Sequence, residues 1–143
     1  MYKRQPLHVQ FLGNDANRLA QNAARVVELG APAIDLNFGC PAKTVNRHRG
    51  GAVLLDEPDV IYSLVKAVRD AVPAHIPVSA KMRLGYLDPN NTVENAHAIA
   101  NAGASWLTVH ARTKADGYKP PAPWDKLPAI QHANNIHVIA NGE

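Results

Sequence analysis

The feature that most constrains the fold of this chain is a regular alternation of two sequence patterns. Five short apolar runs are rich in β-branched residues and too short for helices; they cover residues 7–12, 33–37, 77–83, 106–110 and 137–140. Between them, apolar residues recur every three or four positions, which is typical of amphipathic helices. This order predicts a parallel sheet with right-handed helical crossovers.

The helical segments carry boundary signals. The first covers residues 15–29, with Gly30 at the position that commonly ends a helix. Pro58 can open the second, over residues 58–72, and Pro73 stops it. Thr92 is the expected N-cap of the third, which Gly103 closes, and residues 124–132 show a weaker helical pattern. The longest irregular stretches are expected at residues 38–57 and 114–123.

Two α/β architectures fit this order: a doubly wound open sheet and a (β/α)8 TIM barrel. No GxGxxG follows the first strand, and polar side chains end nearly every strand instead. These are Gln10, Asn37, Cys40, Lys81, Arg83, His110, Arg112 and Asn141. Polar residues at many strand ends favour the barrel, whose site is ringed by them. A full barrel takes about 250 residues, so residues 1–143 are expected to supply only about strands 3 to 7.

Composition excludes several classes of protein. No apolar run reaches the roughly 20 residues of a membrane span, and residues 1–6 lack the apolar core of a secretory signal. The single cysteine cannot form an internal disulfide, which fits a reducing compartment. The net charge of +3 is compatible with a polyanionic partner but does not show one, and on charge alone an ordinary basic protein is the favoured interpretation.

Cys40 is the first candidate for chemistry. It directly follows a predicted strand, and the nearby cations Lys43, Arg47 and Arg49 favour an ionisable thiol. The alternative is a small buried apolar side chain, which is how most lone cysteines behave.

Lys81 and His110 are the next candidates. Alternation along the strand turns Lys81 and Arg83 toward the barrel interior. A buried ammonium needs a partner, which could be a bound anion, an electron-rich ring or the carboxylate of Asp35. His110 could join Lys81 in holding a phosphate or a polar heterocycle, or be structural.

Two loops could contact phosphate. Residues 141–143 follow the last strand and contain Gly142, whose backbone could approach a ligand; a plain turn is the alternative. Residues 43–52 form a basic, glycine-containing loop that could contact nucleic-acid phosphates or simply be solvated. The remaining histidines show no metal-binding spacing, so no metal site is predicted.

Together these segments resemble the tRNA-dihydrouridine synthases. The resemblance is carried by DLNFGCPAKTVN at residues 35–46, GGAVLL at 50–55, VSAKMRLG at 78–85, VHARTK at 109–114 and VIANGE at 138–143. Residues 46–55, 62–78 and 117–118 look most like the bacterial C subfamily, associated with the uridine at about position 16 of tRNA. The segment Arg47-His48-Arg49 is more basic than the small, glycine-rich sequence expected there.

The resemblance implies a cytoplasmic, monomeric enzyme with an FMN-binding TIM barrel and a C-terminal helical domain that helps to hold tRNA. NADPH reduces the flavin, which gives hydride to C6 of a flipped-out uracil. Relative to that pattern, the first two strands, the eighth strand and the helical domain lie outside this sequence.

The resemblance also implies roles for individual residues. Cys40 matches the proton donor to C5. Contacts with the flavin are implied for Gln10, Lys81, His110, Asn141, Gly142 and Glu143. Contacts with the target uridine or its backbone are implied for Asn37, Arg83 and Glu94. Two alternatives remain: a flavin-dependent barrel that reduces a small molecule such as dihydroorotate or an enoate, and an inactive truncated fragment that associates through exposed edges.

Overall fold

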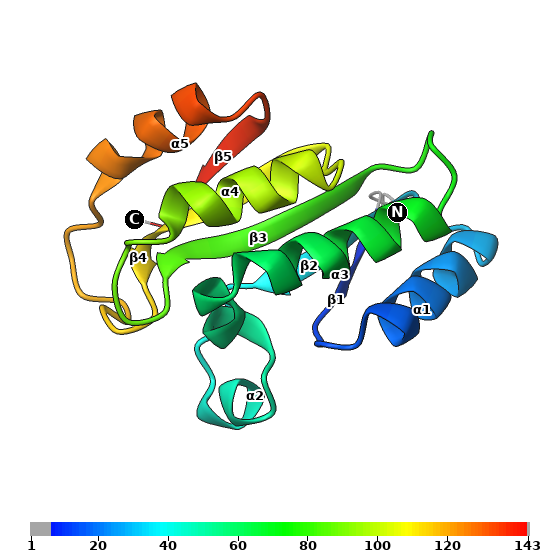
Figure 1. Cartoon of the computed structure of the whole chain (residues 1–143), viewed down its shortest axis with the longest axis horizontal. Coiled ribbons are helices and arrows are strands. Elements are labelled where there is room, and N and C mark those ends of the chain that lie inside the picture. Colours follow the sequence, from blue (N-terminus) through cyan, green and yellow to red (C-terminus); the bar gives the residue numbers. More distant parts are fainter. Residues whose placement is uncertain (1–6, 143) are drawn as a thin grey trace, which may run out of the picture.

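The computed structural model describes residues 7–142 as a parallel sheet covered by helices (Figure 1). The strands are β1 (His8–Phe11), β2 (Ala33–Phe38), β3 (Val78–Gly85), β4 (Trp106–Thr113) and β5 (His137–Asn141). The helices are α1 (Ala16–Glu28), α2 (Lys43–Arg47), α3 (Pro58–Ala71), α4 (Thr92–Asn101) and α5 (Leu127–Ala133), with 3-10 turns η1 (Gly51–Asp56) and η2 (Trp124–Lys126). None of the helices within residues 7–142 is long and apolar enough to span a bilayer.

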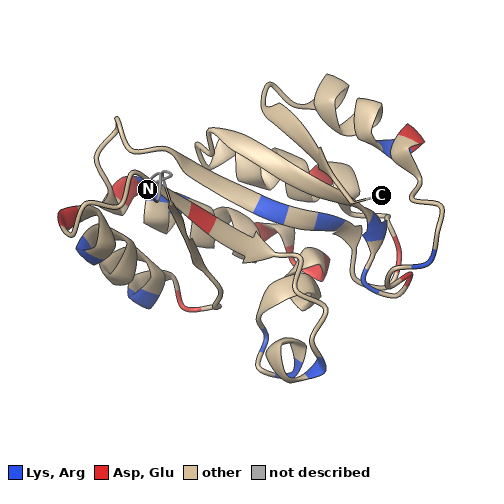
Figure 2. Ribbon diagram, turned by 180° about the vertical axis from the view of Figure 1, so that it is seen from behind, with Lys and Arg blue, Asp and Glu red and all other residues tan. Residues whose placement is uncertain are grey.

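The order of the strands decides between the two predicted architectures. The sheet runs β1-β2-β3-β4-β5, and each neighbouring pair is parallel. Helices α1, α3, α4 and α5 lie on one face, and the view from behind shows the opposite face without helices (Figures 1 and 2). A doubly wound sheet reverses its strand order and carries helices on both faces. The barrel prediction is therefore confirmed, as part of a TIM barrel.

The core lies between the sheet and this helix layer. Helix α3 buries Ile61, Leu64, Val65 and Val68, which recur at the spacing of one helix face, against apolar strand residues such as Ile34. Each such side chain contributes roughly 1.5–3 kcal/mol by leaving water. The core thereby holds the strands rigidly in register.

The predicted helix ends are confirmed in part. The carboxylate of Asp15 accepts the backbone N–H three residues on, at 3.0 Å, and Gly30 has the left-handed φ of 96° that ends α1. The N-cap prediction for Thr92 is wrong by one residue: Asn91 precedes α4 and makes no side-chain cap. The buried Thr92 hydroxyl donates to the Pro89 carbonyl at 2.6 Å instead.

The prediction that residues 38–57 are irregular is wrong in part. Residues 43–47 form α2, which projects beyond the ends of the strands (Figure 1), and residues 51–56 form η1, which packs into the core with Ala52, Leu54 and Leu55 fully buried. Helices of five and six residues are too short to show a periodic apolar face, so their pattern was absent from the sequence.

Candidate active site

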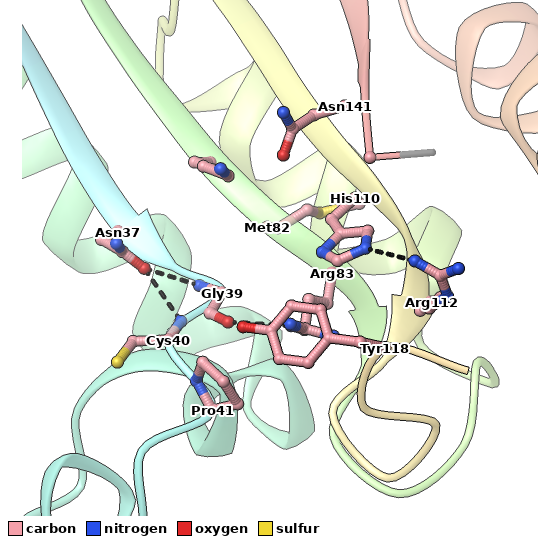
Figure 3. Close-up of a pocket in the computed structure, with 12 residues that line it drawn as sticks. Asn37, Gly39, Cys40, Pro41, Met82, Arg83, His110, Arg112, Tyr118 and Asn141 are labelled. Atoms are coloured by element: carbon pink, nitrogen blue, oxygen red, sulfur yellow. Dashed lines mark hydrogen bonds between the residues drawn. The ribbon is translucent and has the colours of Figure 1, made fainter. Parts of the chain in front are cut away.

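A cavity of about 500 Å³ opens where the carboxyl ends of β2, β3, β4 and β5 meet (Figure 3). It is lined by Asn37, Gly39, Cys40, Pro41, Lys81, Met82, Arg83, His110, Arg112, Tyr118, Asn141 and Gly142. This volume falls within the range of small-molecule sites. Most of the residues predicted to form a site are thus brought together from four strands.

The turn that carries Cys40 is held by Asn37. Its Oδ1 atom accepts the backbone N–H groups of Gly39 and Cys40, at 2.9 and 3.0 Å (Figure 3). Cys40 is half-buried at the cavity wall. The side chain of Asn37 therefore sets the direction in which this turn leaves β2.

Asn37 is oriented in turn by a chain of polar groups that crosses the sheet. Its Nδ2 atom donates to Gln10 at 2.9 Å, and Gln10 donates to the carboxylate of Asp35 at 2.6 Å. The Ser79 hydroxyl donates to the other oxygen of Asp35. Because a carboxylate only accepts, this chain fixes both amide orientations. Gln10 itself does not line the cavity.

Lys81 reaches the cavity from the middle of β3 and is half-buried. Asp35, the alternative partner predicted for it, bonds to Gln10 and Ser79 instead. Lys81 has no hydrogen bond or ion pair with a residue in the described range 7–142, so its ammonium is available to an anion or an electron-rich ring.

Arg83 joins the two sides of the cavity. It is only 2% exposed, and its Nε atom donates to the Gly39 carbonyl at 3.0 Å. Its Nη1 atom donates to the carbonyls of Thr113 and Gly117, at 3.1 and 2.9 Å. Burial lowers the pKa of Arg83, and the nearby Tyr118 opposes that shift; the group stays a cation at neutral pH. Arg83 thus links the cysteine turn to the loop after β4.

The opposite wall is built around His110. The Arg112 guanidinium lies 3.1 Å from His110 Nε2 (Figure 3). A guanidinium only donates, so Nε2 is the acceptor and the imidazole proton belongs on Nδ1. Gly142 has a φ of 106°, and a Cβ there would lie 2.8 Å from the His110 ring. Only glycine fits this position without moving the ring.

Sequence reasoning missed Tyr118. Its ring lies 6.0 Å from the His110 ring and 5.1 Å from the Arg83 guanidinium, yet the residue is 67% exposed. The one available signal was an aromatic residue in a long loop after a strand, because long loops within compact domains are often functional.

The predicted site residue Glu94 lies outside this cavity. Glu94 is exposed on the first turn of α4, in a shallow groove with Tyr62 and His97 on the outer helix layer. Glu94 does not line the cavity, and its contact with tRNA stays a prediction. Glu143 lies outside the described residues. Residues 7–142 contain no group of three or more His, Cys, Asp or Glu suited to a metal ion.

The fold and the site define the class of protein: a TIM barrel with a ligand-sized cavity at the carboxyl ends of its strands. A solved structure described as a dihydrodipicolinate synthase family protein from Coccidioides immitis shares this fold. Its TM-score is 0.68 with 16% sequence identity, and the match covers 95% of this chain and 43% of that one.

The chain belongs to the dihydrouridine synthase (Dus) family, which it matches over residues 2–143. It is 57% identical over 138 residues to the tRNA-dihydrouridine(16) synthases of Pseudomonas syringae and Neisseria meningitidis, covering 96% of this chain and 44% and 41% of those proteins. The enzyme of that name from Vibrio cholerae is 58% identical over 139 residues, with 43% of it covered. The chain therefore spans less than half the length of these relatives.

Proposed function

We propose that the protein to which this chain contributes reduces a uridine of tRNA to 5,6-dihydrouridine, with FMN as cofactor and NADPH as reductant. By the names of its relatives, the target is the uridine at position 16. The chain supplies five βα units of the barrel, and the remaining strands and a helical tRNA-binding domain belong to the length it does not span.

The cavity suits FMN in size and in chemistry. Lys81 is half-buried at the cavity wall and has no partner among residues 7–142, so an electron-rich ring can sit beside it. Gly142 has no side chain and leaves backbone open beside His110. Lys81 would hold the flavin ring, and His110, Asn141 and Gly142 its ribityl and phosphate end. The predicted contacts of Gln10 and Glu143 with the flavin stay predictions.

The reaction adds a hydride to C6 and a proton to C5 of uracil. When bound, FMN supplies the hydride after NADPH has reduced it. The Cys40 thiol holds the proton at Sγ and gives it to C5, and the resulting thiolate regains a proton from water. A positioned acid is needed because the charge that develops on the ring must be neutralised. Hydrogen bonds of Asn37 and Arg83 hold the turn that contains Cys40.

The basic segment formed by α2 and the residue that follows it supports a tRNA partner. Lys43, Arg47 and His48 are exposed on it, and the blue segments of Figure 2 mark its positive charge. Arg49 is instead paired with Glu57, at 2.7 Å. Exposed cations next to Cys40 would bind the phosphates that flank a flipped-out base. A tRNA substrate also places the protein in the cytoplasm.

The observation that carries the proposal is that Cys40 and Lys81, which has no partner in the described part of the chain, line one cavity. The test is Cys40→Ala in the full-length protein. We expect NADPH to reduce the bound flavin at the wild-type rate, while dihydrouridine formation falls roughly 10²–10⁴-fold, the contribution of a general acid. Equal turnover by the variant would remove Cys40 as the acid. Turnover of a small enoate with none on tRNA would support the small-molecule reductase instead.

A further inference from the structure

Asn46 is a buried residue of α2 whose side chain reaches back to Cys40. It is 7% exposed, and its Nδ2 atom donates to the carbonyls of Cys40 and Gly50, both at 2.9 Å. The Cys40 carbonyl also accepts the backbone N–H of Ala52, at 3.0 Å. Two donors therefore converge on the carbonyl of the residue that carries the thiol.

The oxygen of the Asn46 amide shows why the amide is held in one orientation. Its Oδ1 atom is buried and has no hydrogen-bond partner within residues 7–142. Turning the amide over would place Oδ1 against two carbonyl oxygens, which repel it, so the orientation is set by the acceptors. A buried amide oxygen without a partner is unfavourable, and the two bonds of Nδ2 offset that cost.

The backbone of Gly51 lies directly against Cys40. Its φ is 68°, and a Cβ there would lie 2.7 Å from the Cys40 carbonyl oxygen and 2.9 Å from the Cys40 Cβ. Asn37 already holds the N–H of Cys40. Both backbone polar groups of Cys40 are thus fixed, and rotation about its Cα–Cβ bond is the freedom left to the thiol.

We propose that Asn46 is a positioning residue for proton delivery: it clamps the Cys40 peptide and thereby fixes the point from which the thiol meets the substrate. This inference rests on the proposed function only in taking Cys40 as the acid. The hydrogen bond of Asn46 to the Cys40 carbonyl exists whatever the reaction is. The rate at which the Cys40 thiol is alkylated tests it without any tRNA.

The test compares Asn46→Asp with Asn95→Asp in the full-length, FMN-loaded protein. The substitutions are matched: each asparagine is buried, and each has an Oδ1 atom without a hydrogen-bond partner in the described part of the chain. Asn95 donates to the carbonyl of Leu55 rather than of Cys40. Aspartate keeps the size of the side chain but, when ionised, offers only acceptors to the carbonyls. Asn46→Ser, with one donor on a shorter side chain, serves as a milder variant should Asn46→Asp fail to fold.

Three rates are measured: flavin reduction by NADPH, flavin reoxidation by tRNA in a single turnover, and alkylation of Cys40 by iodoacetamide. For Asn46→Asp we expect reoxidation to slow about tenfold or more, because small misplacements of a reacting group are costly. Flavin reduction should stay within about twofold, and the alkylation rate should change about threefold or more. Asn95→Asp should leave all three within about twofold.

The proposal is overturned if Asn46→Asp, or Asn46→Ser in its place, leaves alkylation and reoxidation unchanged, or if Asn95→Asp changes both as strongly. A changed alkylation rate with unchanged reoxidation would uphold the clamp and refute Cys40 as the acid. The failure of the clamp and the failure of the proposed function are thus separate results.

Discussion

Replacing Arg83 by lysine should destabilise the barrel although the positive charge is kept. The guanidinium of Arg83 donates three hydrogen bonds to the carbonyls of Gly39, Thr113 and Gly117 from a site that is 2% exposed. The planar guanidinium donates to carbonyls on two different loops at the same time. A lysine ammonium is a single point and cannot reach acceptors that diverge in this way.

The size of the effect follows from the bonds that are lost. A hydrogen bond to a charged group is worth roughly 1.5–3 kcal/mol, and a buried carbonyl left without a donor costs about as much again. Lysine can keep one of the three bonds. Because such terms are not additive and the loops relax, we expect a loss of about 3 kcal/mol in the free energy of unfolding.

The measurement is urea unfolding of the full-length protein, followed by tryptophan fluorescence and far-UV circular dichroism. Arg25→Lys is the control, because the Arg25 side chain is 67% exposed and its ion pair among residues 7–142 is with Glu28, three residues on. It should change stability by less than about 0.5 kcal/mol. A loss below about 1 kcal/mol for Arg83→Lys would refute the role of Arg83 as the link between the two loops.

Three further predictions follow from the site. Gly142→Ala should weaken FMN binding about 10- to 100-fold in a fluorescence titration, because its Cβ would meet the His110 ring, whereas Gly117→Ala, also at positive φ but with open space around it, should change binding much less. Hydrogen bonds from Thr113 lower the pKa of Asp116 below its ordinary value of 3.8. The ionised Asp116 carboxylate therefore stabilises the folded protein above pH 3.8, and this contribution is lost as the pH falls through the folded-state pKa. The melting-temperature difference between wild type and Asp116→Ala should therefore be constant at neutral pH and shrink as the pH is lowered below 3.8, and a difference that stays constant there would contradict the assignment. A protein made of these 143 residues alone should associate through β1 and β5, the outer strands of the sheet, and lack activity; a monodisperse monomer by light scattering that binds FMN fully would contradict this.

Most of the elements could be predicted because their signals are local. The apolar face of α3 and the strand pattern of β3 repeat within a few residues, and Pro58 and Gly30 mark helix ends by their own backbone preferences. The short helices α2 and η1 could not, since helices of five and six residues carry no period. Their contacts are tertiary: Asn46 of α2 bonds to the Cys40 carbonyl, and Leu54 and Leu55 of η1 are buried in the core.

The sequence by itself determined the alternation of strands and helices, and with it the convergence of Cys40, Lys81 and His110 at one edge of the sheet. Only the tertiary structure decided what those side chains touch. Arg83 and Gly39 are 44 residues apart in sequence, yet they share a hydrogen bond that makes Arg83 a link between loops, while its contact with the uridine stays a prediction. Periodicity records which face a residue occupies, whereas a hydrogen-bond partner depends on the distance and angle that only the packed sheet sets.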